Sequence, residues 1–299
     1  MIYFSIIIPV YNRPKTIINT LESIKSQDES SISEIIIIDD CSKDNTLANL
    51  KNFRNKNPFL KIEIIEKIER GGPSIARNIG IKKSKGEIII FLDSDDELLS
   101  GSLKTIYDIF NSDKDLSVYF GKIKRLSGNI YESDRFNKVL KGGYKEYLKT
   151  YEKQGEVLPV VRYSELISKS NLFNEKFLGN ENLLYSTILK NGGTFLRGTK
   201  PVRLYDDVSS NRLSVTNPQL MRNMRNAYIA FIKEHGIGLL IYSQYKFLSV
   251  LGKIIIYNRL IDDKEFLSLD NFFSILSCPI PKFILKRLKF SYTRYNNRK

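Results

Sequence analysis

The chain of 299 residues is long enough to bury a sizeable hydrophobic core, either as one large domain or as a domain with an appendage. Its net charge of +14 is high and indicates an anionic partner, such as nucleic acid, an acidic membrane surface or a phosphorylated substrate. Two cysteines, Cys41 and Cys278, and one histidine, His235, argue against a disulfide framework, a histidine-rich zinc site and a histidine-based catalytic triad, and they fit a reducing cytoplasm.

The first hundred residues alternate between buried strands and amphipathic helices. Apolar runs predict strands over residues 4–10, 34–38, 61–65 and 88–92, and helical spacing predicts helices over residues 16–26, 46–55 and 75–83. The first run is too short for a signal peptide or a membrane span. Strands that are apolar throughout and alternate with helices are typical of a parallel sheet with right-handed crossovers. These residues therefore predict the Rossmann-like half of an α/β fold.

Two of the predicted strands end in acidic loops. Asp93, Asp95 and Asp96 follow the fourth strand, and Asp39 and Asp40 follow the second. Carboxylates this close together stay ionised easily only beside a cation, and open α/β sheets bind their ligands at the carboxyl ends of strands. Because both loops would open at one sheet edge, we favour a divalent-metal site with a phosphate-bearing ligand over a solvated turn with a helix N-cap.

Glycine-rich phosphate loops do not explain this edge. The first strand ends in Pro-Val-Tyr-Asn, which is not a dinucleotide fingerprint, and the segment Gly71-Gly72-Pro73-Ser74 lacks the lysine of a Walker loop. A phosphate would therefore be held by the metal, and the all-oxygen ligands favour Mn²⁺ or Mg²⁺.

Four segments resemble, in order and spacing, the successive signatures of family 2 glycosyltransferases. They are Val10-Tyr11-Asn12, Ile38-Asp39-Asp40-Cys41-Ser42, Ala76-Arg77-Asn78 and Phe91-Leu92-Asp93-Ser94-Asp95-Asp96. The resemblance implies a GT-A fold, with a mostly parallel central sheet flanked by helices, and an inverting mechanism. It also implies a domain over residues 1–215, with a nucleotide-binding half at 1–100 and an acceptor and base half at 101–215.

The resemblance also implies roles for individual residues. The nucleotide-sugar site would consist of Pro9, Tyr11, Asn12, Asp40, Arg77, Asp93, Ser94 and Asp95. Asp40 would accept the imino hydrogen of a uracil, Tyr11 would lie against the base, and Arg77 would orient the nucleoside or phosphates. Asp95 and Asp96 would hold the metal that bridges the diphosphate. Ordinary packing of Tyr11 and a surface ion pair of Arg77 remain open alternatives.

The chain departs from the family pattern at the catalytic base. The family usually has Gly-Glu-Asp where this chain has Gly179-Asn180-Glu181. Counting back from Asn191-Gly192 without a gap places Glu181 on the base, at the start of a helix. A slip by one residue would place Asn182 there, and an amide cannot take up a proton. The structural alternative is that Glu181 only stabilises the helix N-terminus through the helix dipole.

A second departure concerns the metal site. The family often has Tyr-Arg-x-His in the region of residues 201–207, where this chain has Tyr205 in place of the histidine. A third protein ligand could come from Asp206 or Asp207, or water and phosphate could complete the coordination.

The middle of the chain predicts a helix over residues 103–110 and a strand over 118–123. The polar stretch 127–151 follows, with Gly142-Gly143 and the tyrosines Tyr144, Tyr147 and Tyr151. This stretch is either a loop that covers the site and contacts a sugar through its aromatic faces, or an ordinary surface loop.

Residues 216–299 predict a helical C-terminal extension. Its helices would cover residues 220–233 and 237–260, with a break at His235-Gly236. Residues 280–299 form a basic amphipathic tail without a single acidic residue, which is typical of a membrane-surface anchor. A packed terminal helix with a solvated face and a disordered tail are the alternatives.

Together these features predict a metal-dependent inverting glycosyltransferase. It would move a sugar from a UDP-sugar to a hydroxyl of a glycan or lipid-linked acceptor, in bacterial synthesis of a capsule, O-antigen or lipooligosaccharide. The expected location is the cytoplasm, peripheral at the inner face of the cell membrane. An inactive nucleotide-sugar-binding protein is the alternative. The acidic edge of the sheet argues against nucleic acid as the partner.

Overall fold

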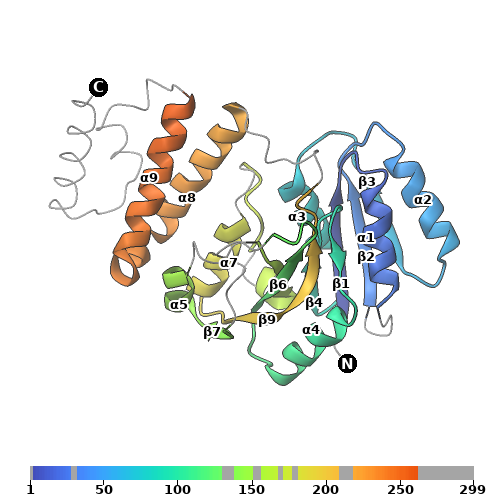
Figure 1. Ribbon diagram of the computed structural model, residues 1–299, viewed down its shortest axis with the longest axis horizontal. Helices are drawn as coiled ribbons and strands as arrows, with labels where there is room; N and C mark the ends of the chain where they lie inside the picture. Colours follow the sequence, from blue (N-terminus) through green and yellow to red (C-terminus); the bar gives the residue numbers. More distant parts are fainter. Residues whose placement is uncertain are drawn as a thin grey trace. The chain divides into compact units, whose positions relative to one another are not determined.

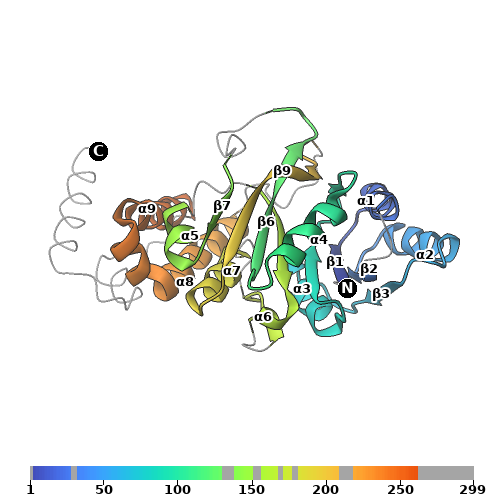
Figure 2. The same ribbon diagram turned by 90° about the horizontal axis from the view of Figure 1, so that it is seen from below.

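The computed structural model describes residues 3–27, 32–129, 138–150, 156–167, 171–176, 181–208 and 218–261. The chain divides into two compact units, residues 1–213 and 214–299, and each is described by itself. The larger unit contains the central sheet, shown from two directions in Figure 1 and Figure 2.

The sheet has the strand order β3-β2-β1-β4-β8-β6-β9-β5, and β7 pairs with β9. The strands are β1 (Phe4–Val10), β2 (Ile32–Asp39), β3 (Ile62–Glu66), β4 (Ile88–Phe91), β5 (Glu97–Leu98), β6 (Val118–Arg125), β7 (Leu140–Gly142), β8 (Leu158–Arg162) and β9 (Phe195–Tyr205). The pairs β2–β3, β1–β2 and β1–β4 are parallel, as predicted for the first hundred residues.

Beyond β4 the sheet is more antiparallel than the sequence suggested. β8 is antiparallel to both β4 and β6, and β5 and β7 are antiparallel to β9, whereas β6 and β9 are parallel. The strands β5, β7 and β8 contain two to five residues, so they are too short for a period of two to stand out in the sequence.

Helices cover both faces of the sheet (Figure 2). On one face, α1 (Thr16–Lys25), α2 (Thr46–Lys56) and α4 (Ser102–Ser112) pack against Phe4, Ile6 and Ile8 of β1. On the other face, α3 (Pro73–Lys83) approaches Ile7 so closely that a Cβ on Gly80 would lie 2.5 Å from the Ile7 Cγ2 atom. Successive residues of a strand point to opposite faces, which explains why β1 is apolar throughout.

The stretch 127–151 is not the single loop that the sequence predicted. It contains β7 and the helix α5 (Tyr144–Thr150), and Tyr147 is fully buried. The Tyr147 ring packs 5.9 Å from Phe120 and 5.8 Å from Phe195, measured between ring centroids. Tyr147 is therefore a core residue and not an aromatic platform for a sugar, while Tyr151 lies outside the described residues.

The second unit contains α8 (Pro218–Tyr242) and α9 (Gln244–Ile261), which pack against each other. The predicted break at His235-Gly236 is wrong, because α8 continues through both residues. His235 is fully buried, with its ring 4.8 Å from Phe231. A glycine inside a helix costs only about 1 kcal/mol, which packing of this kind outweighs. None of the helices in the described residues is both long and apolar enough to span a membrane. The basic tail at 280–299 lies outside the described residues.

Candidate active site

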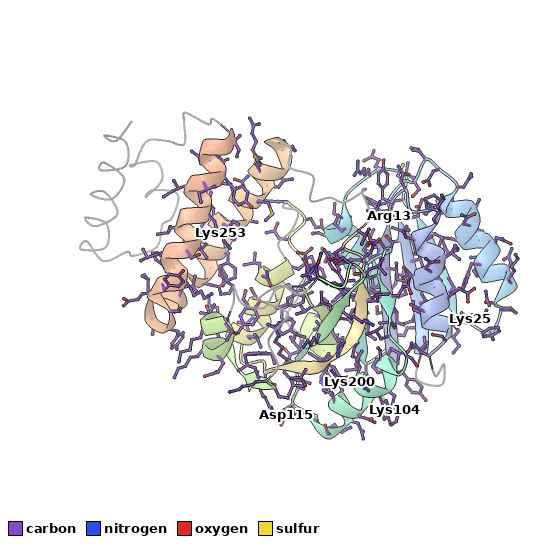
Figure 3. All side chains as sticks on the ribbon, in the orientation of Figure 1. Arg13, Lys25, Lys104, Asp115, Lys200 and Lys253 are labelled. Atoms are coloured by element: carbon purple, nitrogen blue, oxygen red, sulfur yellow. The ribbon has the colours of Figure 1, made fainter. Side chains whose placement is uncertain are left out.

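The carboxyl ends of β2, β1 and β4 lie next to one another at one edge of the sheet. The Asp40 amide, just past β2, donates a hydrogen bond of 2.8 Å to the carbonyl of Val10 at the end of β1, and Pro9 pairs with Ile38. β4 runs parallel on the other side of β1. The two acidic loops therefore open at the same edge, as predicted. Arg13, labelled in Figure 3, lies at this end of the sheet, away from Lys104 and Lys200 at the opposite end.

Asp40 is held by the loop that precedes α3. Its carboxylate accepts hydrogen bonds from the amides of Gly71 (2.8 Å) and Gly72 (2.7 Å) and from the Lys67 ammonium group. Burial alone would raise the pKa of Asp40, but these donors lower it below its ordinary value. The structure therefore presents Asp40 as an ionised acceptor that is fixed in position.

Tyr11 and Asn12 occupy the loop after β1. The Arg70 guanidinium lies over the Tyr11 ring, 4.0 Å from its centroid, so a cation already covers one face of this aromatic side chain. The backbone N–H of Asn12 donates to Ser42 Oγ (3.0 Å), and the side-chain oxygen Oδ1 of Asn12 accepts from the backbone N–H of Lys43 (2.9 Å). Asn12 thus ties the first loop to the second. The sequence did not indicate Arg70, because no motif includes it.

Arg77 joins the start of α7 (Glu181–Lys190) to the end of β4. Its Nη1 atom donates to Glu181 Oε1 at 3.0 Å and its Nη2 atom donates to Asp93 Oδ1 at 2.7 Å. Burial opposes the charge of both Arg77 and Asp93, but their pairing raises the pKa of Arg77 and lowers that of Asp93. With only 9% of its side chain exposed, Arg77 is a buried link and not a surface ion pair. It brings Glu181 to the predicted site.

Glu181 and Asn182 have different partners. Asn182 Oδ1 accepts a hydrogen bond of 3.2 Å from the hydroxyl of Tyr147 on α5, whereas Glu181 is bound to Arg77. Counting back from Asn191-Gly192 left Glu181 and Asn182 as the two candidates for the base. Of these, Glu181 is linked to Asp93, because Arg77 donates hydrogen bonds to both carboxylates. Asn180 lies outside the described residues.

Asn78, the residue after Arg77, holds the segment 171–176 that precedes α7. Its side-chain amide donates to the Phe173 carbonyl and to Glu175, and it accepts from the Phe173 amide, each at 2.9 Å. Phe173 in turn packs edge-on against Phe91 at the end of β4, with 5.0 Å between centroids. The motif contained Asn78, but its partner lies 95 residues away in the chain.

Arg203 on β9 is a second buried arginine that the sequence analysis missed. Its Nη1 atom lies 2.9 Å from Asp96 Oδ2 and 4.0 Å from Asp93 Oδ2, and its Nη2 atom lies 3.7 Å from Glu156 Oε2. Burial raises the pKa of Asp96 even against the pull of Arg203. The available signal was the presence of two arginines, Arg197 and Arg203, among the apolar residues of this strand, since a buried charge requires a partner.

Tyr205, Asp206 and Asp207, at the end of β9 and just after it, make different contacts. The Tyr205 ring, at the place of the family histidine, lies 5.2 Å from the Arg203 guanidinium. The Asp206 amide donates to Asp96 Oδ1 at 3.1 Å, and Asp207 accepts from the Ser127 amide at 2.8 Å. Of the two suggested third metal ligands, Asp206 lies beside the acidic loop after β4 and Asp207 anchors a turn.

Comparison with known proteins decides the family. Residues 5–169, more than half of the chain, match the sequence profile described as Glycosyl transferase family 2. The chain belongs to glycosyl transferase family 2. The family and the GT-A fold predicted from the sequence are thereby confirmed, and the solved structures below support the fold.

The relatives in sequence include bacterial glycosyltransferases. The chain is 31% identical over 210 residues to a GalNAc(5)-diNAcBac-PP-undecaprenol beta-1,3-glucosyltransferase of Campylobacter jejuni, covering 67% of this chain and 63% of the relative. It is 40% identical over 105 residues to the poly(ribitol-phosphate) beta-N-acetylglucosaminyltransferase TarS of Staphylococcus aureus, covering 35% of this chain and 18% of TarS. The chain thus spans less than two thirds of these relatives.

Solved structures of glycosyltransferases have the same fold. Residues 1–349 of S. aureus TarS in complex with UDP-GlcNAc match with a TM-score of 0.64 at 21% identity, covering 93% of this chain and 76% of that one. The mannosyltransferase PcManGT of Pyrobaculum calidifontis, in complex with GDP-Man and Mn²⁺, matches with a TM-score of 0.62 at 15% identity, covering 88% and 76%.

The loop after β4 offers carboxylate oxygens of the kind that bind divalent cations. Asp95 lines a small cavity with Glu97 and Asp206, and burial and the neighbouring Asp93 raise its pKa, so an added cation would stabilise it. Asp95 also pairs with Arg13 at 3.4 Å. Asp96, in contrast, is bound to Arg203, and in the described ranges no three acidic, His or Cys side chains are arranged to hold a metal. The donor chemistry fits Mn²⁺ or Mg²⁺, and Asp95 is the better placed of the two predicted ligands.

Proposed function

We propose that this family 2 chain transfers a sugar from a UDP-sugar to a hydroxyl of a glycan or lipid-linked acceptor, with inversion, in the synthesis of a bacterial surface polysaccharide. The observation that carries the proposal is the bridge from Glu181 through Arg77 to Asp93. It joins a carboxylate that can act as a base to the strand end where a nucleotide diphosphate would bind. The relatives named for undecaprenol-linked and poly(ribitol-phosphate) acceptors support the acceptor class.

In this proposal the nucleoside lies over the ends of β1 and β2. Asp40, which is ionised and fixed, accepts the imino hydrogen of the uracil. The base stacks on Tyr11, which requires the Arg70 guanidinium to move aside or to stack on the far side of the base. Pro9 and Asn12 shape the first loop, and the buried Ser94 supports the turn that carries Asp93 and Asp95.

Glu181 is the proposed general base. It removes the proton from the acceptor hydroxyl, whose oxygen then attacks the anomeric carbon from the side opposite the leaving diphosphate. Arg77 holds the Glu181 carboxylate in place. A divalent metal held by Asp95, with the predicted help of Asp96, would neutralise charge on the leaving diphosphate.

Nucleotide binding tests the proposal directly. We expect UDP and one or more UDP-sugars to raise the melting temperature of the chain in the presence of Mn²⁺, and EDTA to abolish the effect. Asp95→Asn should weaken UDP binding at least tenfold by removing the charge at the metal. Asp108→Asn on α4, whose exposed carboxylate pairs with Lys104 far from this edge, should not. UDP release from the UDP-sugars measures turnover.

The outcomes separate the proposal from its alternative. UDP release that depends on Mn²⁺ supports the transferase. Tight UDP binding without turnover on any acceptor would identify the inactive nucleotide-sugar-binding protein that Asn180 and Tyr205 suggest, since both depart from the family pattern. No response to any nucleotide would contradict both.

We also propose that the chain works at the inner face of the cell membrane, through its basic C-terminus. Residues 214–299 contain fourteen Lys and Arg against five Asp and Glu. We expect the chain to float with anionic liposomes and not with neutral ones, and a variant with the seven basic residues of 280–299 changed to Gln to lose this binding. Equal flotation of the wild-type chain and the variant would show that residues 280–299 do not bind the chain to the membrane.

A further inference from the structure

Glu156 lies at the same sheet edge as the proposed site, just before β8, the strand next to β4. β8 begins at Leu158, two residues after Glu156, and runs antiparallel to β4, which ends at Phe91. Because Ile90 pairs with Val160, the residues just before β8 lie beside those just after β4. This register places Glu156 next to the Asp93 loop, although the two residues are far apart in the chain.

Arg203 holds Glu156 by charge and leaves its carboxylate oxygens available. The distance from Arg203 Nη2 to Glu156 Oε2 is 3.7 Å, which is too long for a hydrogen bond. The Arg203 side chain is 3% exposed and fixed by Asp96, and its Nη2 and Nε atoms have no hydrogen-bond partner among the described residues. In contrast, 51% of the Glu156 side chain is exposed. A buried cation thus orients an accessible carboxylate that accepts no hydrogen bond from the part of the chain that the structure describes.

The strand order indicates what Glu156 would meet. In the proposed site, the uracil base lies at the end of β2, the rest of the nucleoside at the end of β1, and the diphosphate at the end of β4. β8 is the next strand, so a group bound beside Glu156 lies one strand beyond the diphosphate. In a nucleotide-diphosphate sugar that group is the transferred sugar. This step rests on the proposed function.

We propose that Glu156 binds hydroxyl groups of the transferred sugar and determines which donor sugar the chain accepts. Pyranose hydroxyls donate hydrogen bonds, and bonds to an ionised carboxylate are about twice as strong as neutral ones. A site built to bind a particular hydroxyl also rejects a sugar that lacks it or points it elsewhere, because the acceptor is then left unpaired. Arg203 is the positioning residue that holds Glu156 at the correct edge.

The test compares the affinities for UDP and for UDP-sugars. Isothermal titration with Mn²⁺ uses the full chain and UDP, UDP-glucose, UDP-galactose, UDP-GlcNAc and UDP-GalNAc. Glu156→Ala should leave the Kd of UDP unchanged within about twofold and raise the Kd of the preferred UDP-sugar about 10- to 100-fold, as expected for loss of a hydrogen bond to a charged group. Glu156→Gln, which keeps one acceptor oxygen, should raise the Kd of the preferred UDP-sugar by a smaller factor. In both variants the Kd values of the four UDP-sugars should differ less than in wild type.

Glu87→Ala is the matched control, because Glu87 is an exposed glutamate at the opposite end of the β4–β8 pair, where its carbonyl accepts from the Tyr163 amide. It should match wild type with every ligand. Equal losses for UDP and UDP-sugars in Glu156→Ala would show that Glu156 acts only through Arg203, and no loss for any sugar would show that it does not touch the donor; either result overturns the inference. A wild-type chain that binds no nucleotide overturns the proposed function itself.

Discussion

Glu181→Gln is expected to lower kcat by about 10²- to 10⁴-fold, the usual contribution of a general base. The glutamine keeps an oxygen that can accept from Arg77 Nη1, so the contact between α7 and the Asp93 loop should persist. The Kd of UDP should therefore stay within about twofold of wild type, since the substitution removes only proton uptake. Single-turnover measurement of sugar transfer, together with UDP titration, checks both parts.

A surface substitution controls for unrelated effects. Glu22→Gln on α1 removes an exposed carboxylate that pairs with Lys25, and it should leave both constants unchanged. Turnover near the wild-type rate in Glu181→Gln would remove Glu181 from the role of base. A parallel loss of UDP affinity would instead mean that Glu181 acts through Arg77 on the nucleotide site.

Arg203→Met should destabilise the larger unit by roughly 3–5 kcal/mol, the usual cost of removing one partner of a buried ion pair. Asp96, with a side chain only 1% exposed, would be left without its counter-charge, and Asp93 would lose part of its own. With about 2–4 °C per kcal/mol for a domain of this size, the melting temperature should fall by roughly 6–20 °C. Methionine fills much of the space of the arginine stem, so lost packing contributes little.

The double variant Arg203→Met with Asp96→Asn separates charge from packing. By removing both charges it should recover at least half of the lost stability in urea unfolding without metal, because no unpaired buried carboxylate remains. Lys56→Met, at an exposed residue of α2, serves as control and should change the unfolding free energy by less than about 0.5 kcal/mol. If Arg203→Met is as stable as wild type, the Arg203–Asp96 pair does not support the fold.

Much of the nucleotide-binding half could be predicted from the sequence. Its strands are apolar throughout because both faces are buried, so β1, β2 and β4 stand out as continuous runs of Ile, Val and Phe. The acidic loops after β2 and β4 were predicted to share an edge because parallel strands place their carboxyl ends together. In the half at 101–215, the short β8 and the buried Tyr147 showed no such pattern. In the C-terminal extension, the pair His235-Gly236 predicted a helix break, although His235 is buried within the continuous α8.

The sequence by itself determined the alternation of strands and helices, the acidic strand ends and the family. These properties depend on neighbouring residues, whose spacing records local periodicity and turn chemistry. Only the tertiary structure decided which charges meet: Arg77 reaches Glu181 across 104 positions, and Arg203 reaches Asp96 and Glu156 from another strand. A buried arginine can bind any carboxylate that the fold brings within about 4 Å, so its partners depend on strand order and register, which residue spacing does not encode.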